Sequence, residues 1–137
     1  MSKVTSAGIL VKFGDRYVLG HASGQKHFDI FKGRMDEGEE WIDTALRECQ
    51  EESGLIFVKE DLTLLGHNTY TKNKDLVVYI ARIENFILES LGCTTFLESG
   101  LPEMDFFEVM DFEEMISKVG KSMSRVLSSY EEQIKGF

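Results

Sequence analysis

The sequence predicts one domain with a mixed α/β or α+β sandwich fold, in which a sheet packs against helices. Three observations support this prediction: the length, the strand-like patterns early in the chain, and the helical patterns in its middle and at its end. The chain has 137 residues, and domains commonly contain about 100–150 residues. No repeat or linker divides it, so we expect a single domain over residues 1–137.

Strands are expected where short apolar runs are bounded by turn residues. The predicted strands are 4–12, 16–22, 62–70, 75–83 and 106–110. A turn at 13–15 would join the first two as a hairpin, and a polar turn at 72–74 would join the next two. The uninterrupted apolar run at 76–80 predicts a strand buried on both faces. Residues 21–38 contain three glycines and are expected to be irregular.

Helices are predicted at 39–53, from Asp111 to about 118, and at about 122–135. In the first, an apolar face follows i, i+3, i+4, i+7 spacing. Its members are Ile42, Ala45, Leu46 and Cys49. Gly54 should end this helix as a left-handed C-cap. Asp111 should be the N-cap of the second helix, with Glu114 completing a capping box.

The charge and the cysteines narrow the classes of function. The net charge is −9, from 24 acidic and 15 basic residues, so we expect neither extended nucleic acid binding nor membrane binding. The beginning of the chain does not resemble a signal peptide, which favours a cytoplasmic location. Cys49 and Cys93 lack the spacing of a disulfide framework or a zinc site.

Three glutamates gather near the end of the predicted helix 39–53. Glu48, Glu51 and Glu52 are neighbours at i, i+3 and i+4, and like charges at that spacing destabilise a helix. The helix dipole also disfavours negative charge at a C-terminus. Such violations of local rules are typical of functional sites, and carboxylates suit Mg²⁺ or Mn²⁺. A solvated acidic face and a calcium-buffering helix are the alternatives, although the EF-hand loop pattern is missing.

The glutamates belong to a longer pattern. Gly33 is followed after five residues by Glu39, and after seven more by the run 47–55, Arg-Glu-Cys-Gln-Glu-Glu-Ser-Gly-Leu. This pattern resembles the Nudix box, and the chain therefore resembles the Nudix hydrolases. The resemblance implies an α/β/α sandwich with a mixed β-sheet. It also implies hydrolysis of a nucleoside diphosphate linked to another moiety, with Mg²⁺ or Mn²⁺ as cofactor. One departure is Phe31, where many family members carry proline.

The resemblance also implies roles for single residues. The metal ligands would be Gly33, through its carbonyl, and Glu48, Glu51 and Glu52. Arg47 and Glu39 would orient the carboxylates. The general base would be Glu48 or a later glutamate, with Glu103 and Glu98 as the later candidates.

Substrate residues are predicted around the same segment. Lys32 and Arg34 flank Gly33 and could pair with phosphate, while Tyr70 and Phe28 could stack on a base. The position of Tyr70 and the stretch 20–30 resemble family members that act on dinucleoside polyphosphates. We therefore expect a small-molecule nucleotide substrate of that class, cleaved by a monomer or homodimer. The alternatives are an oxidised nucleoside triphosphate as substrate, and a non-catalytic Nudix-fold module that binds nucleotides.

Overall fold

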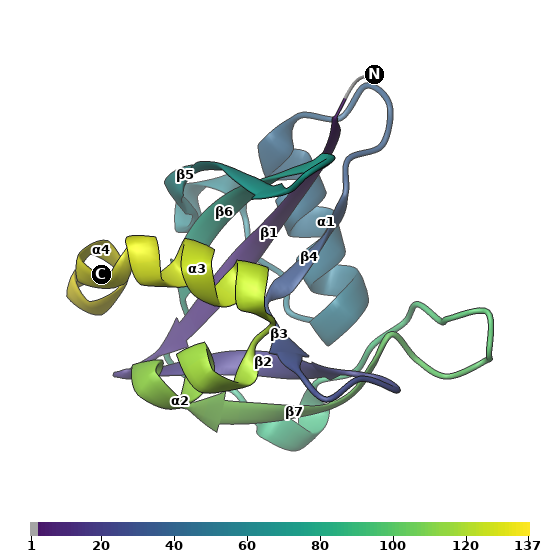
Figure 1. The fold of residues 1–137 in the computed structure, drawn as a ribbon. Coiled ribbons are helices and arrows are strands. Elements are labelled where there is room, and N and C mark those ends of the chain that lie inside the picture. Colours follow the sequence, from purple (N-terminus) through teal and green to yellow (C-terminus); the bar gives the residue numbers. More distant parts are fainter. Residues whose placement is uncertain (1–2) are drawn as a thin grey trace.

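The computed structural model describes residues 3–137, which form a seven-stranded sheet and four α-helices (Figure 1). The strands are β1 (Val4–Phe13), β2 (Arg16–Ala22), β3 (Phe28–Asp29), β4 (Phe31–Arg34), β5 (Thr63–Thr71), β6 (Lys74–Arg82) and β7 (Met104–Met110). The helices are α1 (Trp41–Ser53), α2 (Phe112–Lys118), α3 (Lys121–Ser129) and α4 (Glu131–Gly136). No helix in this described range is long and apolar enough to cross a membrane.

The sheet is mixed and is organised around β1. One edge of β1 pairs in parallel with β6, which pairs antiparallel with β5. The other edge is divided between two strands: β4 pairs with residues 6–9 and β2 with residues 11–13. β2 continues past this pairing to β3 on one side and to β7 on the other. This division brings β4 and the end of β2 to the same region of the sheet.

Helices cover both faces of the sheet, which confirms the predicted α/β/α sandwich (Figure 1). Along β6, alternate residues enter different cores because successive side chains of a strand point to opposite faces. Leu76, Val78 and Ile80 pack with α2, α3 and α4, whereas Val77, Tyr79 and Ala81 pack with α1. The prediction that 76–80 is buried on both faces is therefore confirmed, as is the burial of Cys49.

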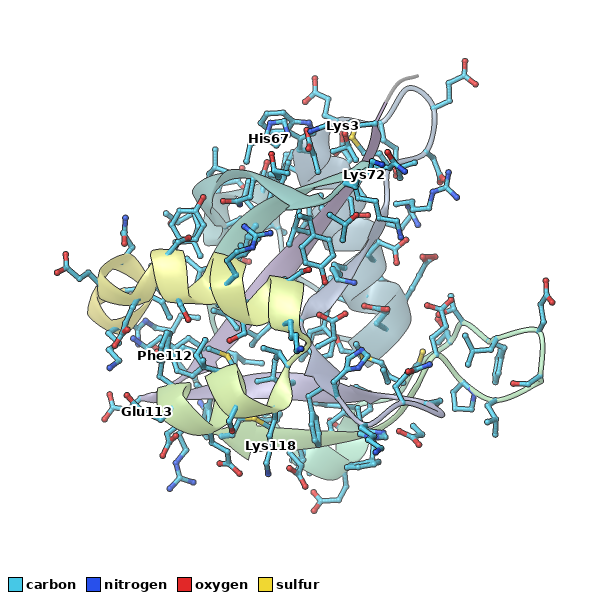
Figure 2. All side chains as sticks on the ribbon, in the orientation of Figure 1. Lys3, His67, Lys72, Phe112, Glu113 and Lys118 are labelled. Carbon is cyan, nitrogen blue, oxygen red and sulfur yellow. The ribbon has the colours of Figure 1, made fainter. Side chains whose placement is uncertain are left out.

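The C-terminal helices pack on the face opposite α1. α2 buries Phe112, exposes Glu113 and leaves Lys118 partly exposed; Figure 2 labels all three. α4 is held by the buried side chain of Lys12, whose Nζ donates to the carbonyls of Ile134 at 2.9 Å, Lys135 at 3.0 Å and Phe137 at 3.3 Å. These carbonyls lie at the end of a helix, where they lack partners within the helix.

The segment 21–38 is not irregular as predicted, because it contains β3 and β4. The pairing that forms β4 is with β1, distant in sequence, so the local glycine signal could not reveal it. The helix predicted at 39–53 begins at residue 41, which leaves Glu39 in the preceding turn. The final strand begins at Met104 and not at 106.

The helix predicted at 122–135 is interrupted at Tyr130. The hydroxyl of Tyr130 donates to Asn68 Oδ1 at 2.6 Å, a contact with β5 that a helical pattern does not report. Asp111 is the N-cap of α2 as predicted, since it accepts from the Glu114 N–H at 2.8 Å. The capping box is only half formed, because the Glu114 side chain pairs with Lys118 at 2.8 Å.

Candidate active site

The candidate site lies where α1 packs against β4. Gly33, in β4, pairs with Ala7 of β1 and faces the carboxylate of Glu48 on α1. A Cβ atom built on Gly33 would lie 2.1 Å from Cδ of Glu48, closer than any real contact. Only glycine therefore allows this strand and this carboxylate to approach so closely. Gly54 ends α1 with φ 83° and donates its N–H to the Gln50 carbonyl, as predicted.

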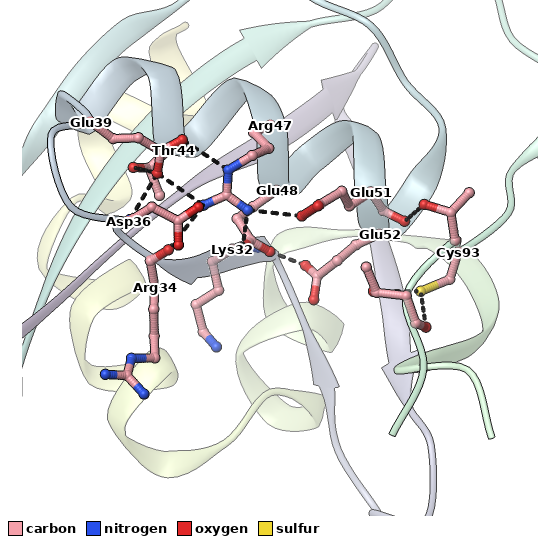
Figure 3. Close-up of polar contacts among 12 residues, drawn as sticks. Lys32, Arg34, Asp36, Glu39, Thr44, Arg47, Glu48, Glu51, Glu52 and Cys93 are labelled. Atoms are coloured by element: carbon pink, nitrogen blue, oxygen red, sulfur yellow. Dashed lines mark hydrogen bonds and ion pairs between the residues drawn. The ribbon is translucent and has the colours of Figure 1, made fainter. Parts of the chain in front are cut away.

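Arg47 is the centre of a charge network on α1 (Figure 3). Its Nε and Nη2 donate to the two carboxylate oxygens of Glu39 at 2.8 and 2.9 Å. Its Nη1 donates to Oε1 of Glu48 and to Oε1 of Glu51, each at 2.9 Å. One guanidinium thus offsets the repulsion between the two helix glutamates, and its forked geometry suits this task. The predicted orienting roles of Arg47 and Glu39 are consistent with these contacts.

Glu39 is held in its ionised form. Hydrogen bonds from Arg47, together with the Asp36 N–H at 2.9 Å, lower the pKa of Glu39 to about 2. The Thr44 hydroxyl donates to the same carboxylate at 2.8 Å. The carboxylate of Glu39 therefore connects the turn before α1 to the helix through several hydrogen bonds.

Glu52 is in a different electrostatic environment. It is only 6% exposed, and its Oε1 accepts from the Lys32 backbone N–H at 2.7 Å. Burial, reinforced by the charge of Asp29, raises the pKa of Glu52 to about 9. Burial also raises the pKa of Glu48. Burial of such carboxyl groups without a cation disfavours their charged form.

The donor set fits a hard divalent cation, because it consists of carboxylate oxygens beside a glycine carbonyl. Within residues 3–137, no three acidic, histidine or cysteine side chains already converge as a metal cluster. The reason is visible in the contacts: Arg47 holds Glu48 and Glu51, while the Lys32 N–H holds Glu52. A cation at this site would supply the positive charge that the buried carboxyl groups otherwise lack.

The carboxylates face a cavity of about 530 Å³. Its lining includes the three helix glutamates, Glu103, and cationic side chains from three positions. These cations are Lys32, Arg34 and Lys74. Sites for small molecules commonly measure about 300–1,000 Å³, so the cavity is large enough for a small polar ligand and offers charges of both signs.

Glu103 reaches this cavity from the segment between η2 (Leu88–Ser90) and β7, part of which extends away from the domain (Figure 1). The segment is attached to the C-terminal end of α1, because the Thr94 N–H donates to the Glu51 carbonyl at 2.7 Å. The Glu103 N–H in turn donates to the Thr95 carbonyl at 3.0 Å. Glu98 is exposed on the same segment and does not line the cavity.

Comparison with known families agrees with this geometry. The profile of the NUDIX domain matches residues 2–129. The chain belongs to the Nudix family. It is a Nudix hydrolase that acts on pyrophosphate bonds. A comparison with curated protein sequences finds no match.

Solved structures share the Nudix fold over nearly the whole chain. A C. elegans Ap4A hydrolase in a binary complex is 22% identical, with a TM-score of 0.74, covering 96% of this chain and 99% of that one. The NUDIX domain of Shewanella oneidensis NrtR, complexed with ADP ribose, is 11% identical, with a TM-score of 0.73 and coverages of 98% and 90%. A MutT protein from Methanosarcina mazei is 13% identical, with a TM-score of 0.69 and coverages of 96% and 95%.

The structure places the four predicted substrate residues of this Nudix domain at different positions relative to the cavity. Lys32 and Arg34 line the cavity, and Lys32 Nζ lies 2.8 Å from Asp29 and 5.8 Å from the centre of the Tyr70 ring. Tyr70 is half-buried and packs against the core cluster to which α3 contributes. Phe28 is the exception, because its ring is buried in the core against His21, and it is not free to stack on a base.

Sequence reasoning missed Asp29, Lys74 and Ser23 as lining residues of the Nudix site. Asp29 belongs to the segment predicted to be irregular, and Lys74 was expected in a turn. Each reaches the site only because β3, β4 and β6 converge on β1 and β2. No local spacing in the sequence contains that information.

Proposed function

We propose that this Nudix hydrolase cleaves dinucleoside polyphosphates, using Mg²⁺ or Mn²⁺ held by Glu48, Glu51, Glu52 and the Gly33 carbonyl. The observation that carries the proposal is the set of one buried and two half-buried carboxylates at the wall of a 530 Å³ cavity that cationic side chains also line. The cations suit a phosphate chain, and the carboxylates require a metal to accompany it. A cavity of this size suits a small nucleotide better than an extended nucleic acid.

The bound metal would neutralise phosphate oxygens and assist the attack of water on phosphorus. The chain's own residues supply the other requirements. Arg47 positions Glu48 and Glu51, and Lys32 and Arg34 bind the phosphate chain. Glu103 accepts the proton of the attacking water, since it lines the cavity and its charge acts on Glu48. The backbone hydrogen bonds of Glu103 hold this residue at the cavity wall.

Two features of the sequence and one similar solved structure favour a dinucleoside polyphosphate as the substrate. The stretch 20–30 and the tyrosine at position 70 resemble members acting on such substrates, and Tyr70 lies beside Lys32. The C. elegans Ap4A hydrolase shares the fold over almost the full length of both chains. We also propose a cytoplasmic protein that acts as a monomer or homodimer.

The test is a substrate panel with Mg²⁺ and with Mn²⁺, read by chromatography of the products. The panel contains dinucleoside polyphosphates, nucleotide sugars, and ordinary and oxidised nucleoside triphosphates. We expect the highest kcat/KM with a dinucleoside polyphosphate and the release of a nucleoside monophosphate. A clear preference for an oxidised triphosphate would replace the proposed substrate, and binding without turnover would indicate a non-catalytic module.

A further inference from the structure

One buried hydroxyl in the described part of the chain has no hydrogen-bond partner. Ser23 follows β2 and is 4% exposed, and among residues 3–137 its Oγ is the one buried side-chain oxygen or nitrogen without a partner. Another buried serine shows the usual situation: Ser53 Oγ donates to the Cys49 carbonyl at 2.6 Å and accepts from the Leu55 N–H at 3.1 Å. An unsatisfied buried polar group destabilises the folded state, so its presence calls for an explanation.

The position of Ser23 in the cavity wall offers an explanation for its unpartnered hydroxyl. The residue lines the cavity that holds the acidic cluster of α1. Its backbone N–H donates to the Glu103 carbonyl at 3.1 Å, so it is fixed beside the proposed base. The side chain moves by rotation about one bond, and each staggered rotamer places Oγ differently. The oxygen therefore remains available to a ligand group at the cavity wall.

The other groups in the cavity indicate which ligand atom the hydroxyl would meet. Ionised carboxylates can only accept hydrogen bonds, and two of the strong donors near them are already engaged. Lys32 Nζ pairs with Asp29 at 2.8 Å, and Arg47 is shared among three glutamates. A phosphate oxygen is an acceptor that needs donors, and Ser23 offers one without breaking an existing bond.

We propose that Ser23 donates a hydrogen bond to a non-bridging phosphate oxygen of the substrate. This inference rests on the proposed function, because it assumes that the phosphate chain enters this cavity. It gives the otherwise unsatisfied hydroxyl a role in substrate binding. The phosphate chain would then contact a donor that follows β2 as well as the cationic side chains of β4.

The test is the variant Ser23→Ala, which should bind substrate more weakly without losing stability. Removing a buried hydroxyl that has no partner should leave the melting temperature unchanged or raise it. Removing a donor to a charged phosphate should weaken binding by about tenfold or more. The matched control is Ser129→Ala on α3, where Oγ donates to the Val126 carbonyl at 2.6 Å. Because Ser129 is exposed on a helix, this control should change the melting temperature little and keep its affinity.

Two readouts separate the inference from the proposed function. The first is KM and kcat for the best substrate of the panel. The second is calorimetric binding of inorganic pyrophosphate with Mn²⁺, which needs no turnover. Weaker pyrophosphate binding by Ser23→Ala supports the inference even if the wild type cleaves nothing. Unchanged pyrophosphate affinity and unchanged KM overturn it, even if the wild type is active. A lowered melting temperature with unchanged affinity also overturns it, because that result indicates a structural role.

Discussion

Replacing Glu39 by glutamine tests whether the Arg47 network is held by charge. The pKa of Glu39 is lowered from its ordinary 4.5 to about 2, first by hydrogen bonds from Arg47 and then by the Asp36 N–H. A shift of that size corresponds to about 3 kcal/mol at neutral pH. The side chains of Arg47 and Glu39 are 30% and 20% exposed, so solvent screening lowers the expected contribution to about 1–2 kcal/mol.

The sign of the pH dependence follows from the direction of the shift. A carboxyl with a lowered pKa in the folded state contributes its full stability above pH 4.5, and loses it as the pH falls toward 2. Glu39→Gln should therefore lower the free energy of unfolding by about 1–2 kcal/mol at pH 7, or the melting temperature by about 3–10 °C. The difference from the wild type should shrink steadily below pH 4.5.

Urea denaturation at pH 7, 5.5 and 3.5, followed by circular dichroism, measures this difference. The matched control is Glu37→Gln, an exposed acid in the same turn, which should change stability by less than about 0.5 kcal/mol. Equal loss of stability in the two variants would show that Glu39 is not held by the charge of Arg47. An effect of Glu39→Gln that is as large at pH 3.5 as at pH 7 would contradict the lowered pKa of Glu39.

Three further variants test other parts of the structure. Gly33→Ala should displace the carboxylate of Glu48, because the new Cβ would overlap it; we expect Mn²⁺ affinity by calorimetry to fall at least tenfold, and unchanged affinity would contradict the observed packing. Lys12→Met should lower the free energy of unfolding by about 1–3 kcal/mol, since it leaves helix-end carbonyls of α4 unpaired, with kcat per folded molecule unchanged; equal stability in urea would show that these bonds contribute nothing. Glu103→Gln should reduce kcat by at least about 100-fold, whereas Glu98→Gln should not; equal effects of the two would reject Glu103 as the base.

The sequence was most informative where a local pattern and a local structure coincide. The apolar spacing of α1, its glycine cap and the Asp111 N-cap depend on neighbouring residues, and all three are present in the structure. The same holds for the strand predicted at 75–83, because its apolar run at 76–80 indicates burial on both faces. The Nudix box likewise depends on a fixed spacing of residues around a single helix.

The sequence was least informative where distant segments meet. β4 forms by pairing with β1, and the break in the last helix falls at Tyr130, whose hydroxyl contacts Asn68 on β5. Phe28 was predicted to contact substrate, yet its ring completes a core that α2 and α3 close from the other end of the chain. Ser23 lies in the stretch 20–30 whose resemblance pointed to the substrate class, but its unpartnered hydroxyl could be recognised only after the cavity was seen.

The most direct test of the central claim is a Mn²⁺ titration of the wild type and of Glu52→Gln by calorimetry, in parallel with turnover of a dinucleoside polyphosphate. The amide oxygen of the glutamine can still accept the Lys32 N–H, and a neutral group suits the buried position, so the variant should melt at or above the wild-type temperature. We predict that its Mn²⁺ affinity falls at least tenfold and its kcat at least 100-fold, and that excess chelator stops the wild type. Equal Mn²⁺ affinity in the two proteins, or full activity of the wild type in chelator, would contradict a metal site built on the glutamates of α1.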